Sequence, residues 1–323
     1  MTNVQIVTSD GKIWNPENTY LEIVYASQQG LVSLDLLREG PCCQTSGIDS
    51  MLNSIIKQFG FDPALYSIIT SNQLSSSCYP ERRVGWTELN LAKEKLAKSA
   101  STESTLNKRF AIFIGRSNWQ RLGLASHLWA NYKDQTAMTF HFDSSIDYHI
   151  VNFGLETLIT KEKSAWPEVY SFIQQLPIRS ESMSYPILWN KGAFDLDKYY
   201  QDIFCEIVCE TYFTGCTFFV TEKTLRCIIN RRPFIVQGPK WFLHNLKKLG
   251  FKTFDQWWDE GYDTDHSDSR YKTLCSNIDY IAQQSATTIK QWYQEMQPIL
   301  EHNIQVMQQL TNNQIINTEF FYE

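Results

Sequence analysis

The chain has 323 residues, of which 43% are hydrophobic and 20% are charged, and its formal net charge is −6. This composition excludes a disordered chain, and the acidic balance argues against tight binding to a nucleic-acid backbone. No apolar run reaches the roughly 20 residues that a membrane span requires, and no signal peptide is evident. The eight cysteines form no CxxC pair, which argues against a zinc site or a disulfide framework. We therefore expect a cytoplasmic protein without a membrane span.

The first hundred residues are typical of a small α/β unit. Its candidate strands are residues 4–7, 21–25, 31–37 and 66–70. Helical spacing of apolar residues predicts a helix over 48–59, and a second helix is expected over 88–98. The segment 99–107 is rich in Ser and Thr and is typical of a linker. We place the domain boundary there, with an N-terminal domain over 1–105 and a C-terminal domain over 106–323.

A second α/β unit begins at residue 110. A buried strand is expected over 110–114, followed by Gly115, a helix over 119–129 and a strand over 139–142, whereas 143–195 show no clear pattern. The next apolar strand ends at Glu210, a helix begins at Thr221, and another strand follows Pro233. Residues 241–249 predict a helix ended by Gly250, and 278–310 are mostly helical with a kink at Pro298.

These elements predict an α/β fold with two Rossmann-like domains facing a cleft and a long C-terminal helix. Ligands are expected between the two domains. The terminal helices have enough length to pack back on the N-terminal domain.

Lys223 is the most unusual charged residue of this pattern. Thr221 is a suitable N-cap, which places Glu222 and Lys223 in the first turn of a helix. The helix macrodipole disfavours a cation there, unless the lysine and the free N–H groups face a shared anion such as a phosphate. A capped surface helix with ordinary charges is the alternative interpretation.

Three segments in succession resemble the donor-binding motif of the fucosyltransferase family. Residues 204–210 form an aromatic-containing strand that ends in an acid, 219–223 read Phe-Val-Thr-Glu-Lys, and 232–238 form a strand after proline. Residues 249–263 resemble the C-terminal extension of fucosyltransferase-like enzymes. The resemblance is clear over 200–263 and weak over 115–121. Thr211 replaces the asparagine usual in the family, so fucose is not implied as the donor sugar.

The resemblance implies a glycosyltransferase of the GT-B type, with a nucleotide-sugar donor in the C-terminal domain and the acceptor in the N-terminal domain. Lys223 would pair with the donor diphosphate. Glu222 would bind hydroxyls of the ribose or the sugar, and Glu210 would contact the sugar or brace the loop. Thr221 would open the helix that carries these donor-binding residues.

Arginines after the first strand of the second unit are further candidates for diphosphate binding. Arg116 lies at the mouth of the expected helix and Arg121 one turn inside it, and arginine forms bidentate contacts to phosphate. Both are equally consistent with solvated arginines at a helix end. With Lys223 they supply cations for a leaving diphosphate, and no Asp-x-Asp motif is present, so we expect no metal and no cofactor.

Transfer to an acceptor hydroxyl requires a base, which we expect to be a carboxylate of the N-terminal domain. Glu39 is the first candidate, with Asp35 and Glu81 as alternatives. The expected function is an inverting, metal-independent glycosyltransferase acting on an unspecified hydroxyl-bearing acceptor. The alternatives are a non-catalytic nucleotide- or glycan-binding protein on a degenerate fold, or another nucleotide-dependent enzyme. The Trp257-Trp258 pair is interpreted as packing, with acceptor stacking as the second option.

Overall fold

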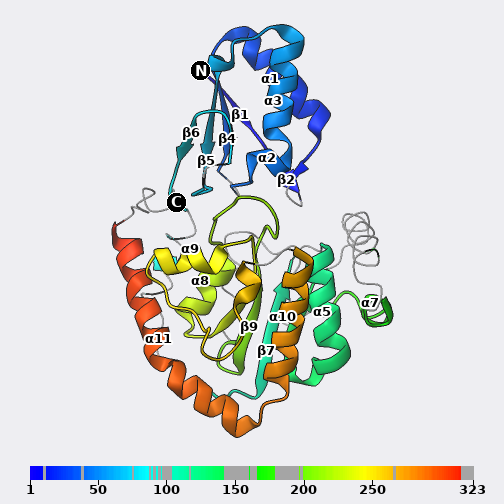
Figure 1. Cartoon of the computed structure of the whole chain (residues 1–323), viewed down its shortest axis with the longest axis vertical. Coiled ribbons are helices and arrows are strands. Elements are labelled where there is room, and N and C mark those ends of the chain that lie inside the picture. The colour runs from blue at the N-terminus through cyan, green and yellow to red at the C-terminus, as the bar shows by residue number, and fades with distance from the viewer. Residues whose placement is uncertain are drawn as a thin grey trace.

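The computed structural model describes residues 1–9, 12–37, 40–74, 76–86, 89, 92–93, 96, 104–115, 118–141, 160, 166–178, 196, 199–264 and 267–313. They form an α/β fold with two four-stranded parallel sheets, as the α/β part of the prediction requires. Figure 1 shows the first sheet in the upper part of the molecule and the second sheet in the lower part.

The first sheet has the strand order β1-β4-β5-β6. These strands are β1 (Thr2–Gln5), β4 (Val32–Leu36), β5 (Tyr66–Thr70) and β6 (Glu81–Arg83). The helices α1 (Pro16–Gln29) and α3 (Ile48–Phe59) pack beside each other and cover the sheet (Figure 1). Short elements complete this unit: β2 (Thr8–Ser9), β3 (Lys12–Ile13), α2 (Cys43–Ser46) and the 3₁₀ turn Pro63–Leu65.

The second sheet has the strand order β10-β9-β7-β8. These strands are β7 (Lys108–Ile114), β8 (Thr136–Phe140), β9 (Ile203–Cys209) and β10 (Phe234–Gln237). The chain passes from β7 to β8 on one side and returns to β9 on the other side of β7. The strand order therefore reverses between β7 and β9, and such a switch point is where open α/β sheets bind ligands.

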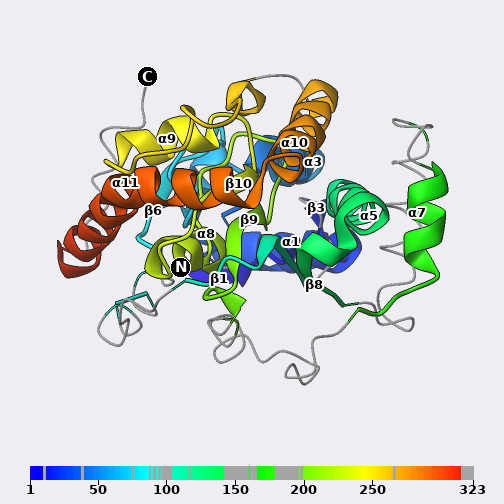
Figure 2. The same ribbon diagram turned by 90° about the horizontal axis from the view of Figure 1, so that it is seen from below.

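Helices on both sides of the second sheet bury its strands. They are α5 (Trp119–Tyr132), α7 (Trp166–Ile173), α8 (Glu222–Ile229), α9 (Phe242–Lys248), α10 (Ser267–Ala282) and α11 (Ala286–Asn313), with 3₁₀ turns at Lys133–Gln135 and Gly261–Asp263. The helix α10 packs beside α5, and α11 packs beside α8 (Figures 1 and 2). No helix in the described part of the chain has the length and hydrophobicity to cross a bilayer.

Two separate hydrophobic clusters form the cores. One contains buried side chains from Val4 to Tyr79, and the other contains side chains from Trp86 to Met307. The change from one cluster to the next thus lies upstream of the linker expected over residues 99–107. Buried side chains of α11, such as Leu300, belong to the second cluster.

Several elements agree with the sequence patterns, whereas β1 lies at Thr2–Gln5 rather than 4–7 and β8 at Thr136–Phe140 rather than 139–142. The helix α3 and the strand β5 have the predicted bounds. The strand predicted over residues 21–25 is wrong, because these residues lie inside α1. Leu21 and Tyr25 are 64% and 66% exposed, whereas Ile23 and Ala26 are buried at helical spacing.

The C-terminal helical region also differs from the prediction. Residues 278–310 belong to two helices, α10 and α11, which are separated at residues 283–285. Pro298 lies inside α11, as expected. The helix expected over 88–98 falls largely outside the described residues, as does most of 143–195.

Candidate functional site

The switch point of the second sheet brings together residues from two strand ends. Glu210 directly follows β9, and Arg121 lies in the first turn of α5, the helix that follows β7. The Nη2 atom of Arg121 donates to the carbonyl oxygen of Glu210 at 2.6 Å, so this bond bridges the two strand ends. Gly115, at the end of β7, faces open space, since a Cβ atom there would meet nothing within 4 Å.

The Glu210 carboxylate is buried, with 1% of the residue exposed. Its Oε1 atom accepts hydrogen bonds from the Thr224 hydroxyl at 2.5 Å and from the Thr221 N–H at 3.4 Å. Its Oε2 atom has no hydrogen-bond partner among the described residues. Burial raises the pKa of Glu210, although the charge of Lys223 and the two hydrogen bonds oppose this shift. Glu210 therefore retains a proton to a higher pH than an exposed glutamate does.

Lys223 lies in the first turn of α8, as the sequence predicts. Its Nζ atom is 3.0 Å from Glu222 Oε1 and donates to the Thr221 hydroxyl at 3.2 Å. Burial raises the pKa of Glu222, but the charge and hydrogen bond of Lys223 and the charge of Arg226 outweigh it and lower that pKa. The ion pair with Glu222 offsets the unfavourable position of Lys223 at a helix N-terminus. The position of Lys223 is thus accounted for without a ligand.

Thr221 is the N-cap residue of α8, as predicted. Its hydroxyl accepts a hydrogen bond from the Lys223 N–H at 3.2 Å, and its φ and ψ are extended. The helix then buries Leu225, Ile228 and Ile229 in the second hydrophobic cluster. Because this apolar face packs into the core, the first turn of α8 lies at the carboxyl edge of the sheet.

A buried ion pair that the sequence patterns did not reveal fixes α8 against β9. Arg226 Nη2 lies 2.7 Å from Glu206 Oε1, and the two side chains are 3% and 2% exposed. Tyr200 contacts both members through its hydroxyl. Because each charge is compensated inside the core, removing one partner would leave the other uncompensated. This network holds α8, and with it Lys223, in one orientation.

Two of the predicted site residues, Glu39 and Arg116, lie outside the described residues. The alternative bases are described and hold turns together. Asp35 accepts the Leu37 N–H at 3.0 Å, and Glu81 accepts from the Ser76 hydroxyl at 3.2 Å and from Arg83 at 3.4 Å. No contact joins the Asp35 or Glu81 carboxylate to Glu210 within the described part of the chain.

The carboxyl edges of the two sheets face each other through their loops. After β5, Asn72 donates to the Cys216 carbonyl at 2.9 Å and accepts from the Phe218 N–H at 2.9 Å. The adjacent Gln73 N–H donates to the Phe218 carbonyl at 3.0 Å. After β4, the Gly40 carbonyl accepts from the Thr217 hydroxyl at 2.6 Å. The loop between Glu210 and Thr221 is thereby attached to the first unit.

Sequence reasoning also missed two buried polar residues at the edge of the second sheet. Arg270 donates to the carbonyls of Tyr262, Phe213 and Gly238, and so ties three loops together. Gln237 ends β10 with 0% exposure, and neither side-chain polar atom has a partner among the described residues. A buried side-chain amide without hydrogen-bond partners is uncommon. A polar residue closing an apolar strand was the available signal for Gln237.

No group of three or more His, Cys, Asp or Glu side chains that could hold a metal occurs within the described ranges. No protein-family model matches the chain, and no curated protein sequence does either. The chemistry of the site therefore has to be judged from its own residues.

Proposed function

We propose that the protein is a glycosyltransferase that moves a sugar from a nucleotide-sugar donor to an acceptor hydroxyl, with inversion and without a metal. The convergence of Glu210, Lys223 and Arg121 at the switch point of the second sheet carries this proposal. The loops that join the carboxyl edges of the two sheets support a GT-B-like arrangement. The donor would then occupy the second unit, and the acceptor would approach from the first.

Lys223 and Arg121 are the cations in the described part of this edge that suit the donor diphosphate. Lys223 would exchange its contact with Glu222 for a phosphate oxygen, and Glu222 would then accept from a ribose or sugar hydroxyl. Arg121 donates from Nη2 to the Glu210 carbonyl, which places its guanidinium at the carboxyl edge beside the proposed donor site. Two cations near the bridging oxygen would stabilise the leaving diphosphate.

The proposed step is a single displacement. The acceptor oxygen forms a bond to the anomeric carbon while the bond from that carbon to the diphosphate oxygen breaks. The acceptor proton passes to a carboxylate of the first unit, and Glu39 remains our candidate for this base. Glu210, buried beside Lys223, would orient the donor sugar through its Oε2 atom.

Thermal stability in the presence of UDP- and GDP-sugars tests the proposed donor site. A nucleotide sugar present at about 100 times its dissociation constant should add roughly 2.7 kcal/mol to the free energy of unfolding. Lys223→Ala should abolish the shift, because the variant lacks the diphosphate contact. Lys57→Ala, which changes an exposed lysine on α3, should leave the shift unchanged.

Mass spectrometry of mixtures with acceptor saccharides separates the enzyme from a binding protein. A transferred sugar that persists in EDTA supports metal-independent transfer. Binding without any transferred sugar would instead identify a non-catalytic nucleotide-binding protein. If no nucleotide or nucleotide sugar stabilises the protein, the proposed function is wrong.

A further inference from the structure

A pocket of about 560 Å³ lies between the loop 255–259 and one face of α10. Thr273, Ser276, Asn277 and Tyr280 line it from the helix, and their spacing places them on the same face. None of the residues assigned to the proposed donor site lines this pocket. Its volume falls within the range of about 300–1,000 Å³ that is typical of small-molecule sites.

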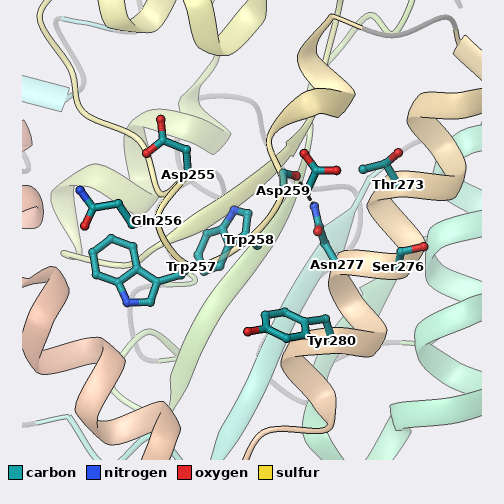
Figure 3. Close-up of a pocket in the computed structure, with 9 residues that line it drawn as sticks. All are labelled: Asp255, Gln256, Trp257, Trp258, Asp259, Thr273, Ser276, Asn277 and Tyr280. Carbon is teal, nitrogen blue, oxygen red and sulfur yellow. Dashed lines mark hydrogen bonds between the residues drawn. The ribbon is translucent and has the colours of Figure 1, made fainter.

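Each wall of the pocket carries both aromatic rings and polar groups. Figure 3 shows Trp257 and Trp258 on the loop with Asp255, Gln256 and Asp259, and Tyr280 on α10 with Thr273, Ser276 and Asn277. Tyr280 is 47% exposed, whereas Trp258 is only 4% exposed. The Trp258 indole N–H is buried and has no acceptor within the described ranges, and a buried indole normally finds one.

Hydrogen bonds hold the walls of this pocket in place. Asn277 Nδ2 donates to the Asp259 carbonyl at 2.6 Å, which joins α10 to the loop. Asp259 Oδ1 accepts from the Gly261 N–H at 2.7 Å. Glu260 accepts from the Phe254 N–H at 2.8 Å and from the Thr253 hydroxyl at 2.6 Å, which fixes the start of the same loop. A preorganised pocket loses little freedom when it binds a ligand.

The charges of the lining residues restrict the ligand class. Neither lysine nor arginine lines the pocket, while two aspartates do, so phosphorylated and other anionic ligands are disfavoured. Asp255 is paired with Lys247 at 3.0 Å, and Asp259 is engaged with the Gly261 amide, so a strong cation site is not favoured either. A neutral molecule with an apolar face and several hydroxyl groups matches the aromatic rings and the polar side chains of this lining.

We infer that this pocket binds a neutral saccharide, with one sugar ring against Trp257 or Tyr280 and its hydroxyls toward the polar side chains of the lining. A pyranose presents C–H groups on one face, which pack on an aromatic ring, and hydroxyls around its edge. This inference does not depend on the proposed transfer reaction. If the protein is a glycosyltransferase and this inference also holds, the pocket binds a saccharide at a place separate from the hydroxyl that receives the transferred sugar.

Calorimetric titration and tryptophan fluorescence with defined compounds test the saccharide pocket. The probes are maltotriose, cellotriose, lactose, N,N′-diacetylchitobiose and choline. We expect at least one of the neutral saccharides to bind, and Trp257→Ala to raise its dissociation constant by about tenfold, as loss of one aromatic contact would. Tyr280→Ala should also weaken binding. Trp257→Phe, which keeps an aromatic ring, should retain part of the affinity if Trp257→Ala folds poorly.

Two control variants keep this result distinct from the proposed donor site. Trp14→Ala changes a tryptophan that is 60% exposed elsewhere, and it should bind as the wild type does. Lys223→Ala should keep saccharide binding even if it loses nucleotide binding. The inference is overturned if none of the saccharides binds, if choline binds in their place, if both aromatic variants keep full affinity, or if Lys223→Ala abolishes saccharide binding.

Discussion

At the scale of single residues, the two oxygens of Glu210 have different surroundings. Oε1 is held by Thr224 and Thr221, whereas Oε2 has no partner in the described part of the chain. Burial of such a group penalises its charged form. Lys223 reduces the penalty without removing it, because the pKa of Glu210 remains raised. Burial of this carboxyl group therefore lowers the stability of the folded protein, and such a cost favours a role for Glu210 in ligand binding.

The raised pKa of Glu210 predicts how stability depends on pH. A raised pKa in the folded state gives stability that is present below the unfolded pKa of glutamate and is lost as pH rises through the folded pKa. Glu210→Gln cannot ionise, so we expect the wild type to lose stability relative to this variant as pH increases from about 4 to 8. Thermal unfolding of both proteins across this range provides the measurement.

An exposed carboxylate serves as the control for that experiment. Glu22→Gln alters an exposed residue of α1, and its stability relative to the wild type should vary little over the same range. A difference between wild type and Glu210→Gln that stays constant with pH would contradict the raised pKa.

At the scale of elements, α8 depends on its N-cap for both stability and site geometry. The Thr221 hydroxyl accepts from the Lys223 N–H and from the Lys223 ammonium. Thr221→Ala removes both interactions, and we expect a loss of about 1 kcal/mol in the free energy of unfolding. Urea denaturation measures this loss. Thr221→Ser keeps the hydroxyl and should retain most of the stability, so equal destabilisation by both substitutions would argue against capping.

Elements whose signals are local were predictable from the sequence. The helix α3 combines apolar residues at helical spacing with Gly60, whose φ of 71° ends the helix. The strand prediction for residues 21–25 failed because the alternation of apolar residues was short, while the buried face of α1 contains small residues such as Ala26 and Ser27. When a helix buries small or polar residues, the helical spacing of apolar residues in its sequence is hard to recognise.

The part of the candidate site that depends on local sequence signals was predictable from the sequence. Thr221, Glu222 and Lys223 are adjacent in sequence, so their place at the start of α8 followed from capping rules. The contact between Arg121 and Glu210 joins residues 89 positions apart, and the ion pair of Glu206 and Arg226 joins a strand to a helix. Such contacts depend on the packed sheet and leave no periodic signal in one sequence.

At the scale of the whole molecule, the contacts between the two sheet edges depend on a few buried polar groups. Asn72 is 0% exposed and bonds the Cys216 carbonyl and the Phe218 N–H, while Trp86 packs against the Phe218 ring with 5.5 Å between centroids. The loop that carries these partners begins at Glu210 and ends at Thr221. The same loop therefore contributes to the proposed donor site and attaches it to the first unit.

The Asn72 side chain gives a direct test of this attachment. Asn72→Ala removes the hydrogen bonds to the Cys216 carbonyl and the Phe218 N–H, and the loss of each bond costs about 1 kcal/mol. We expect faster amide hydrogen exchange across residues 211–220 and a lower free energy of unfolding, whereas the core of the second sheet keeps its protection. Asn131→Ala alters an exposed amide on α5 that bonds His127 and Glu168, and it should leave exchange across residues 211–220 unchanged. If exchange across 211–220 in Asn72→Ala equals that of the wild type, the loop is held by its own unit, through Arg270 and Phe213, and the two sheets are coupled by apolar packing alone.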